Sequence, residues 1–221
     1  MSRSERIRRF YDELHKKYGP QGWWPGDSPL ECIVGAILTQ STSWKNVEKA
    51  MLNLKNAGLL TVERLGLVTP EELAALVRPS GYYNQKAVKI KNFISFLGEG
   101  YGGSLEKMFA EDKSVLREKL LSIKGIGPET ADSILLYAGG MPVFVVDAYT
   151  WRVLSRHGIV PAETTYAEMQ EVFTGSLDED AGLYNEYHAL IVRLGKEHCR
   201  KSSPDCEGCP LEFDPHFVTE G

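Results

Sequence analysis

A single carboxylate stands where an apolar segment ends and a helical pattern begins. Asp147 follows Val145 and Val146 and precedes the helical pattern of residues 148–157. Aspartate is favoured at helix N-termini, where its side chain accepts a backbone N–H hydrogen bond, so a structural explanation suffices. A carboxylate at this place could instead stabilise a developing cationic sugar, as carboxylates do in glycoside hydrolysis. The pattern alone leaves both interpretations open.

A Gly-Ile-Gly turn lies between two helical patterns in the segment 121–131. Gly125 and Gly127 allow positive φ and a close approach of the backbone to another surface, and Ile126 would fill the core of the turn. The amides at the start of the second helix, together with its dipole, could hold an anion such as a DNA phosphate. An ordinary connection between two helices would have the same appearance.

Tryptophans surround one predicted helix. Trp23, Trp24 and Pro25 precede it, and Trp44 follows it. Core packing accounts for aromatic residues as well as any other explanation. The functional interpretation is a stacking pocket for a base that has been flipped out of DNA.

Three of the four cysteines form a cluster near the C-terminus. Cys199, Cys206 and Cys209 follow the pattern Cys-x6-Cys-x2-Cys, whereas Cys32 stands in an apolar run and is predicted to be a core thiol. The N-terminus is charged and no apolar signal core follows it, so the chain is expected to be intracellular. Clustered cysteines in an intracellular chain favour metal binding over disulfides.

The 221 residues carry a net charge of −5 and 43% hydrophobic residues, and no apolar run has the length needed to span a bilayer. The overall charge does not indicate nucleic-acid binding, which depends on a local patch. Lys86, Lys89 and Lys91, with Arg78 nearby, are a candidate patch. A solvated helix face explains these lysines equally well.

Hydrophobic periodicity predicts helices nearly throughout, so the fold class is all-α. Only 141–146 has the apolar, β-branched character of a short strand. The predicted helices cover about 7–18, 30–40, 43–57, 69–79, 84–97, 115–122, 130–137, 147–157, 166–173 and 181–197.

In this order and spacing, the hairpin, the later Val-Asp and the C-terminal cysteines resemble the helix-hairpin-helix, Gly/Pro-rich, aspartate (HhH-GPD) superfamily of DNA glycosylases, of which endonuclease III is a member. Leu38-Thr39-Gln40-Ser41-Thr42 also resembles the Leu-x-x-Gln-x-Thr segment of that superfamily. The resemblance implies a two-lobed helical fold. One lobe would be a helical barrel over 28–140, ending in the hairpin, and the other would combine 1–27 with 141–221.

The resemblance also assigns roles. Asp147 would be the catalytic carboxylate at the mouth of a cleft between the lobes, and Gln40 would enter the gap left by the flipped base. The partner would be double-stranded DNA carrying a damaged base, bound by a monomer in the cytoplasm of a bacterium or archaeon. The residues that would contact DNA at the hairpin are Lys124, Gly125, Ile126, Gly127, Glu129 and Thr130.

Glu129 departs from the pattern of those members that also cleave the strand, which carry a lysine there. Because a lysine amine attacks the sugar to form a Schiff base and Glu129 cannot, the resemblance implies hydrolysis by water and an abasic product. Glu129 could simply be a favourable acid in the first turn of its helix.

The tryptophan segments and the Gly-Pro-Glu hairpin resemble those of the helix-hairpin-helix 3-methyladenine DNA glycosylases. An N3- or N7-alkylated purine is cationic, and aromatic faces attract a cation by ~0.5–2 kcal/mol. The substrate pocket would contain Trp23, Trp24, Pro25, Trp44 and Gln40. A glycosylase for oxidised or mismatched bases, or a non-catalytic helix-hairpin-helix DNA-binding protein, is the alternative.

The cysteine spacing matches the first three ligands of the [4Fe–4S] loop of the superfamily, but Pro215 stands where the fourth cysteine would be. Three alternatives remain: a cluster with a non-cysteine or absent fourth ligand, a zinc site of three cysteines and a histidine (His198 or His216), or a loop without metal. Of these, the cluster is favoured, in a structural role.

Overall fold

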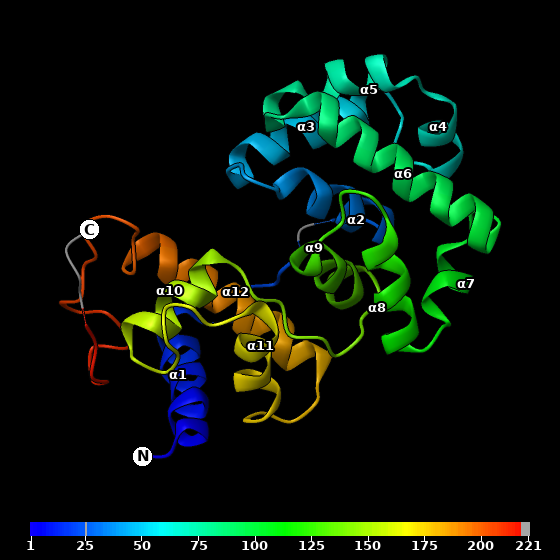
Figure 1. Ribbon diagram of the computed structural model, residues 1–221. Coiled ribbons are helices and arrows are strands. Elements are labelled where there is room, and N and C mark those ends of the chain that lie inside the picture. The colour runs from blue at the N-terminus through cyan, green and yellow to red at the C-terminus, as the bar shows by residue number, and fades with distance from the viewer. Residues whose placement is uncertain (25, 218–221) are drawn as a thin grey trace. The chain divides into compact units, whose positions relative to one another are not determined.

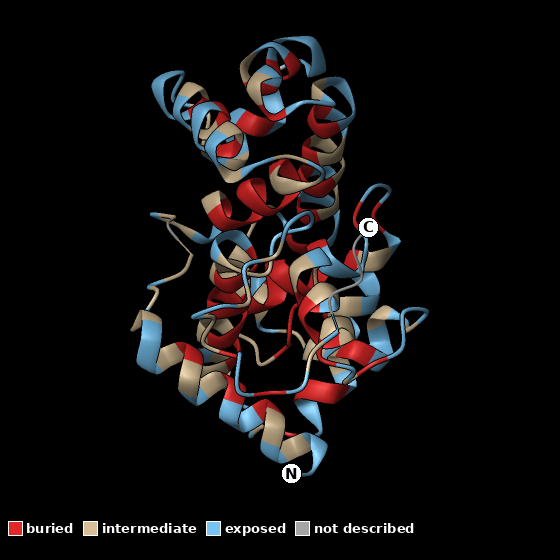
Figure 2. Cartoon of the chain, turned by 90° about the vertical axis from the view of Figure 1, so that its left-hand side faces the viewer, coloured by how far each residue is buried: buried red, intermediate tan, exposed pale blue. Residues whose placement is uncertain are grey.

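Helices account for the regular secondary structure of the protein in the computed structural model, which describes residues 1–24 and 26–217 (Figure 1). Within those residues there is no β-strand, and no helix is long and apolar enough to cross a membrane. The all-α fold class predicted from periodicity is therefore confirmed. Buried residues recur along one side of most helices, with exposed residues between them (Figure 2).

The chain divides into two compact units. One consists of Met1–Trp23 with Pro142–Gly221, and the other of Trp24–Met141. Each unit has its own buried apolar core.

The first unit is built on helices from both ends of the chain. Phe144 and Phe173 stack with ring centroids 3.8 Å apart, and the Tyr187 hydroxyl donates to the backbone oxygen of Ile7 at 2.8 Å. These contacts join the N-terminal helix to the C-terminal helices through a core of aromatic rings. The helices are α1 (Arg3–Tyr18), α10 (Ala148–Arg156), α11 (Tyr166–Thr174) and α12 (Ala181–Glu197).

The second unit surrounds a central helix, α2 (Pro29–Thr39), whose residues 32–38 are all buried. A helix that is apolar on most faces needs neighbours on most sides, and α3, α6 and α9 pack against it. The other elements of this unit are α3 (Trp44–Asn56), α4 (Val62–Leu67), α5 (Pro70–Val77), the 3-10 turn η1 (Arg78–Ser80), α6 (Tyr83–Tyr101), α7 (Leu105–Phe109), α8 (Lys113–Ser122), α9 (Pro128–Ser133) and the π-helical turn η2 (Ile134–Ala138).

The strand predicted at 141–146 is wrong. Residues 143–146 are buried, as an apolar run should be, but they have no regular secondary structure. β-branched residues favour a strand only where a neighbouring strand can pair with them, and the described residues contain none. The short helices α4 and α7 were not predicted, because six and five residues are too few to give a periodic pattern.

Both interpretations of the lysine cluster on α6 need correction. The Lys86 side chain is buried and donates to the backbone oxygens of Leu38 (2.8 Å) and Ser80 (2.6 Å). Lys91 donates to three backbone oxygens at the end of α4, which is neither a solvated face nor a phosphate-binding position. Cationic side chains at helix C-termini stabilise the exposed carbonyl groups and the helix dipole, and this explains both lysines.

Candidate functional site

Asp147 is the N-cap residue of α10. Its Oδ1 accepts hydrogen bonds from the Thr150 backbone nitrogen at 2.8 Å and from the Thr150 hydroxyl at 3.0 Å. Its side chain is 13% exposed. The structural interpretation of Asp147 is therefore correct, and it does not exclude a chemical role, because the second carboxylate oxygen is not used in the cap.

That second oxygen, Oδ2, lies 3.5 Å from Nε2 of His188 on α12. Burial raises the pKa of Asp147, but His188 and the Thr150 donors favour the charged form more strongly, so its pKa lies below the usual value. The carboxylate is thus ionised at neutral pH although it is largely removed from water. A buried carboxylate held in its charged form can stabilise a cation that develops beside it.

The Gly-Ile-Gly hairpin connects α8 to α9. Its turn is closed by a hydrogen bond from the Ile126 nitrogen to the Ile123 oxygen at 3.0 Å, and Ile126 is buried. Arg117 on α8 forms a bidentate ion pair with Asp132 on α9, at 2.6 and 3.0 Å, which fixes the two helices together. The residues of the hairpin that reach the surface are Lys124, Gly125, Gly127, Pro128 and Glu129, whereas Thr130 is buried.

The two glycines of the hairpin meet different requirements. Gly125 has φ +98°, and a Cβ there would lie 2.5 Å from the Lys89 side chain, so the fold itself requires glycine. Gly127 has φ −98° and a Cβ there would meet nothing within 4 Å. Because the fold tolerates a side chain at position 127, glycine there leaves the backbone open to a surface outside the chain.

We expect Gly127→Ala to fold normally and to bind every duplex DNA sequence more weakly, by roughly tenfold, because a methyl group would hold a phosphate away from the backbone amides. Fluorescence anisotropy on two unrelated undamaged duplexes at one salt concentration would measure this. Gly100→Ala is the matched control, since Gly100 is exposed, lies on α6 and also has nothing within 4 Å of a Cβ. Unchanged affinity of a folded Gly127→Ala protein would mean that the hairpin does not bind DNA.

Gln40 lies against the hairpin. Its Nε2 donates to the Gly125 oxygen at 3.2 Å and to the Thr130 hydroxyl at 2.9 Å, and its Oε1 accepts from the Lys89 ammonium. The structure thus brings together Gln40 and two of the predicted hairpin residues. Lys89 was predicted only as part of a basic patch, because the sequence gives no sign that it faces Gln40.

The position of Gln40 depends on the buried ammonium of Lys86. This group binds the Leu38 oxygen at the end of α2 and the Ser80 oxygen in η1, so it fixes the segment that leads into Gln40. Burial and the nearby Lys89 lower the pKa of Lys86 to about 8. No property of the sequence distinguishes this lysine from an exposed one.

Trp24 and Trp44 are brought together. Their rings meet edge to face with centroids 4.9 Å apart, and Trp24 also contacts Tyr137 at 5.1 Å. Trp24 lies directly on α2 at Gly35, where a Cβ would be 2.9 Å from the indole. Both tryptophans line a pocket that also includes Glu31, Glu48, Met51 and Lys55. Trp23 lies in the other unit, and Pro25 is outside the described residues.

The three clustered cysteines line one pocket, together with His198 and His216. Burial, together with the neighbouring thiols Cys199 and Cys206, raises the pKa of Cys209 to about 11. Burial and Cys199 also raise the pKa of Cys206. The loop is held by α10, whose Arg156 Nη1 lies 3.3 Å from the Cys199 Sγ and whose Arg152 donates to the Cys199 oxygen at 2.6 Å.

The three thiols and two imidazoles that line this pocket are donor types that a soft metal or an iron–sulfur cluster prefers. The geometry is not that of a closed site: in residues 1–24 and 26–217 no three histidine, cysteine or carboxylate side chains are arranged to hold a metal ion.

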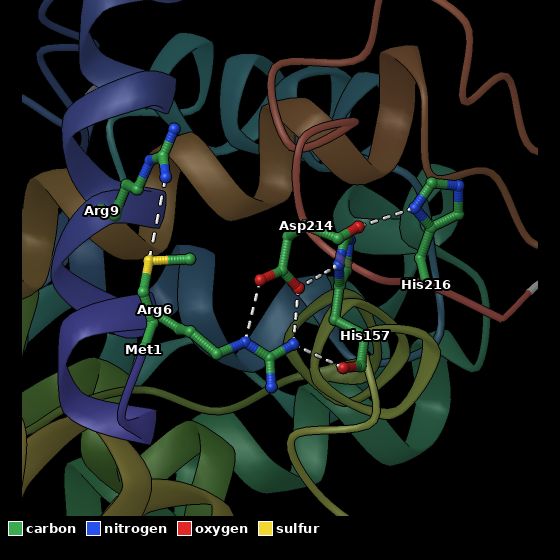
Figure 3. Close-up of polar contacts among 6 residues, drawn as sticks. All are labelled: Met1, Arg6, Arg9, His157, Asp214 and His216. Atoms are coloured by element: carbon green, nitrogen blue, oxygen red, sulfur yellow. Dashed lines mark hydrogen bonds and ion pairs between the residues drawn. The ribbon is translucent and has the colours of Figure 1, made fainter.

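The cysteine loop is anchored at its far end by a charged cluster (Figure 3). Arg6 on α1 binds Asp214 through Nε at 2.8 Å and Nη2 at 2.5 Å, and Nη2 also donates to the His157 backbone oxygen at 2.7 Å. The His157 Nδ1 lies 2.9 Å from Asp214 Oδ2, and the Asp214 side chain is 0% exposed. This cluster was not predicted, because a lone aspartate in a polar loop carries no sequence signal.

The sequence of the chain is similar to those of DNA repair proteins. The HhH-GPD superfamily of base excision DNA repair proteins matches residues 34–178 of the chain. The "Putative DNA repair glycosylase MJ1434" of Methanocaldococcus jannaschii is 48% identical over 210 residues, which cover 94% of each chain.

Two solved structures are also similar. The 3-methyladenine DNA glycosylase MagIII of H. pylori, bound to 1,N6-ethenoadenine, is 31% identical with a TM-score of 0.76, over 89% of this chain and 98% of that one. An endonuclease III in a non-covalent complex with DNA is 25% identical with a TM-score of 0.82, over 96% of this chain and 95% of that one.

Proposed function

Because the chain belongs to the HhH-GPD superfamily of base excision DNA repair proteins and is a DNA glycosylase of that superfamily, we propose that it is monofunctional. It hydrolyses the N-glycosidic bond of a flipped, damaged base in double-stranded DNA and leaves an abasic site. The preferred lesion is an alkylated purine such as 3-methyladenine.

The observation that carries this proposal is the largely buried carboxylate of Asp147, which is held by Thr150 at Oδ1 and faces His188 at Oδ2. As the base departs, the sugar acquires oxocarbenium character, and a fixed negative charge lowers the energy of that state. Oδ1 is held by Thr150, so the position of the carboxylate is set before DNA arrives. The base takes the electrons of the glycosidic bond, which neutralise its positive charge. A water molecule then attacks the anomeric carbon of the cationic sugar and releases one proton to the solvent.

Glu129 supports the monofunctional part of the proposal. It is exposed and lies in the first turn of α9. Members of the superfamily that also cleave the strand carry a lysine at this position of the hairpin motif. A carboxylate cannot form a Schiff base with the sugar, so no covalent intermediate forms and the enzyme does not cleave the strand.

The pocket beside Trp24 and Trp44 supports an alkylated purine. It combines two indole rings with the carboxylate of Glu48, and both kinds of group attract a cation, whereas Glu31 in the same pocket is already paired with Lys55 at 2.9 Å. A base alkylated at N3 or N7 is cationic and already a good leaving group, so it needs little help from a general acid. The similarity to MagIII, a 3-methyladenine DNA glycosylase, agrees with this choice.

We expect the protein to release 3-methyladenine from alkylated duplex DNA and to leave the strand intact until alkali is added. Free base would be measured by chromatography and strand breaks by denaturing electrophoresis, with and without alkaline treatment. Borohydride should trap no protein–DNA adduct, because no Schiff base forms.

An endonuclease III with a damaged duplex that it cleaves is the positive control for trapping and for strand cleavage, since one such protein has been trapped in a covalent intermediate with DNA. Trapping of the wild-type protein on DNA would contradict the monofunctional proposal. Release of oxidised or mismatched bases, without release of alkylated purines, would contradict the proposed substrate and leave the glycosylase assignment intact.

We further propose that Cys199, Cys206 and Cys209 hold a [4Fe–4S] cluster, with zinc as the alternative metal. Either would cross-link the loop to the rest of its unit, since the loop has few buried apolar side chains apart from Leu211. Base hydrolysis requires no electron transfer, so the group would stabilise structure and take no part in the reaction.

Protein produced with ample iron is expected to be brown and to contain iron and sulfide in equal amounts. Replacing Cys206 by serine should remove the colour and loosen the loop, which elemental analysis and limited proteolysis would detect. Colourless protein with about one zinc per chain would favour the tetrahedral alternative. Cys32→Ser is the control, because Cys32 is buried in the other unit.

A further inference from the structure

The two oxygens of the Asp147 carboxylate have different neighbours. Oδ1 accepts from the Thr150 nitrogen and hydroxyl and is therefore committed to the N-terminus of α10. Oδ2 faces Nε2 of His188 at 3.5 Å. That separation is long for a hydrogen bond but well within the range in which a polar or charged group acts on a carboxylate.

His188 is held in place by the packing of its own helix. Its side chain is 9% exposed and lies in the middle of α12, which packs against α10. Tyr187, the residue beside it, is buried and donates to the Ile7 oxygen at 2.8 Å, which fixes α12 on α1. A ring enclosed in this way has little freedom to turn away from Asp147.

The contact with His188 favours the charged form of the Asp147 carboxylate. Burial disfavours the charged form of Asp147, and His188 is the largest influence that opposes burial. Without a polar neighbour at Oδ2, the carboxylate would be more easily protonated, and only the two Thr150 donors at Oδ1 would remain to orient it. Both changes would weaken the stabilisation of a cationic sugar.

We propose that His188 is a positioning residue for base excision, which acts on the reaction through Oδ2 of Asp147 and makes no contact with DNA. The inference rests on the proposed role of Asp147 as the carboxylate that stabilises the developing cation. It assigns to α12 a part in the chemistry that neither the hairpin nor the N-cap of α10 supplies.

A double-mutant cycle tests this inference. The rate of base release under single-turnover conditions would be measured with full-length protein and a duplex carrying 3-methyladenine, for wild type, His188→Leu, Asp147→Asn and the double variant. His188→Leu is expected to lower the rate about tenfold in the wild-type background and less than twofold in the Asp147→Asn background, because residues that act as a unit are not additive.

Three further measurements separate positioning from a loss of structure. His188→Gln should restore the rate to within about threefold of wild type, since the glutamine amide can donate to Oδ2. Affinity for undamaged duplex should be the same for all variants. Leu190→Ala removes a buried side chain from the opposite face of α12, and its effect on the rate should be small and additive with Asp147→Asn.

The outcomes distinguish the inference from the proposed function. If His188→Leu lowers the rate equally in both backgrounds, or if Leu190→Ala couples to Asp147 as strongly, the inference is overturned. The same holds if His188→Leu leaves the rate unchanged while Asp147→Asn abolishes it. A wild-type protein that releases no base from this duplex or from duplexes carrying oxidised or mismatched bases, or an Asp147→Asn variant with full activity, overturns the proposed function and the inference with it.

Discussion

Replacing Asp147 by asparagine is expected to lower the rate of base excision by about two orders of magnitude or more while leaving the fold and DNA affinity unchanged. Removal of one key electrostatic group from an active site has typically this effect. Asparagine is as good an N-cap residue as aspartate, so its Oδ1 can still accept from Thr150 and α10 can still begin at Ala148. Only the negative charge is lost.

Single-turnover kinetics on damaged duplex would measure this loss, and thermal unfolding and anisotropy would verify stability and binding. Asp180→Asn is a matched control, because Asp180 is the N-cap of α12 in the same unit and its Oδ1 accepts from the Leu183 nitrogen at 2.6 Å. If both variants retain wild-type turnover, Asp147 is an N-cap and nothing more.

Replacing Asp214 by asparagine is expected to destabilise the protein by about 3–5 kcal/mol, the usual cost of removing one partner from a buried ion pair. The carboxylate is fully enclosed and binds both Arg6 and His157, and the Arg6 side chain is only 20% exposed. The substitution leaves the Arg6 guanidinium without a counter-charge in a largely buried place. Thermal unfolding would measure a midpoint lower by roughly 6–20 °C.

Glu197→Gln is the control for this experiment. The pair between Arg193 and Glu197 also joins a guanidinium to a carboxylate, at 2.9 Å, but the two side chains are 41% and 45% exposed. Exposed pairs contribute little, so its midpoint should change by only about 2 °C or less. Equal, small shifts for both variants would show that the Asp214 cluster is not an anchor of the fold.

The sequence predicted those features that depend on neighbouring residues. The helix start at Asp147 and the buried Ile126 of the hairpin follow from local patterns, because a cap residue and an apolar residue between glycines have the same meaning in many folds. The burial of Cys32 was predicted for a similar reason, since the run around it is apolar on nearly every side.

Features that depend on distant contacts could not be predicted. His188 lies in a helix that periodicity predicts well, but nothing in the pattern indicates that it faces Asp147 on α10. Lys86 and Lys91 donate hydrogen bonds to backbone oxygens of other elements. The spacing of the lysines along one helix does not indicate such partners. The strand predicted at 141–146 was wrong for the same reason, because a strand forms only where a second strand pairs with it.

The tryptophans were predicted in part. The pair Trp24 and Trp44 shares a pocket, while Trp23 belongs to the other unit although it is adjacent in sequence to Trp24. A boundary between units can fall between two identical residues, and composition gives no sign of it.

The contacts made along helix α10 restrict insertions and deletions within it. Its nine residues place Asp147 at one end and present Arg152 and Arg156 to the cysteine loop from the other half. Each residue added to a helix turns everything beyond it by about 100° and moves it about 1.5 Å along the axis. An insertion or deletion of a single residue within α10 would therefore direct either the carboxylate or the arginines away from their partners. The length of this helix is therefore as constrained as its end residues, and the connection between α10 and α11 can take an inserted residue without disturbing either set of contacts.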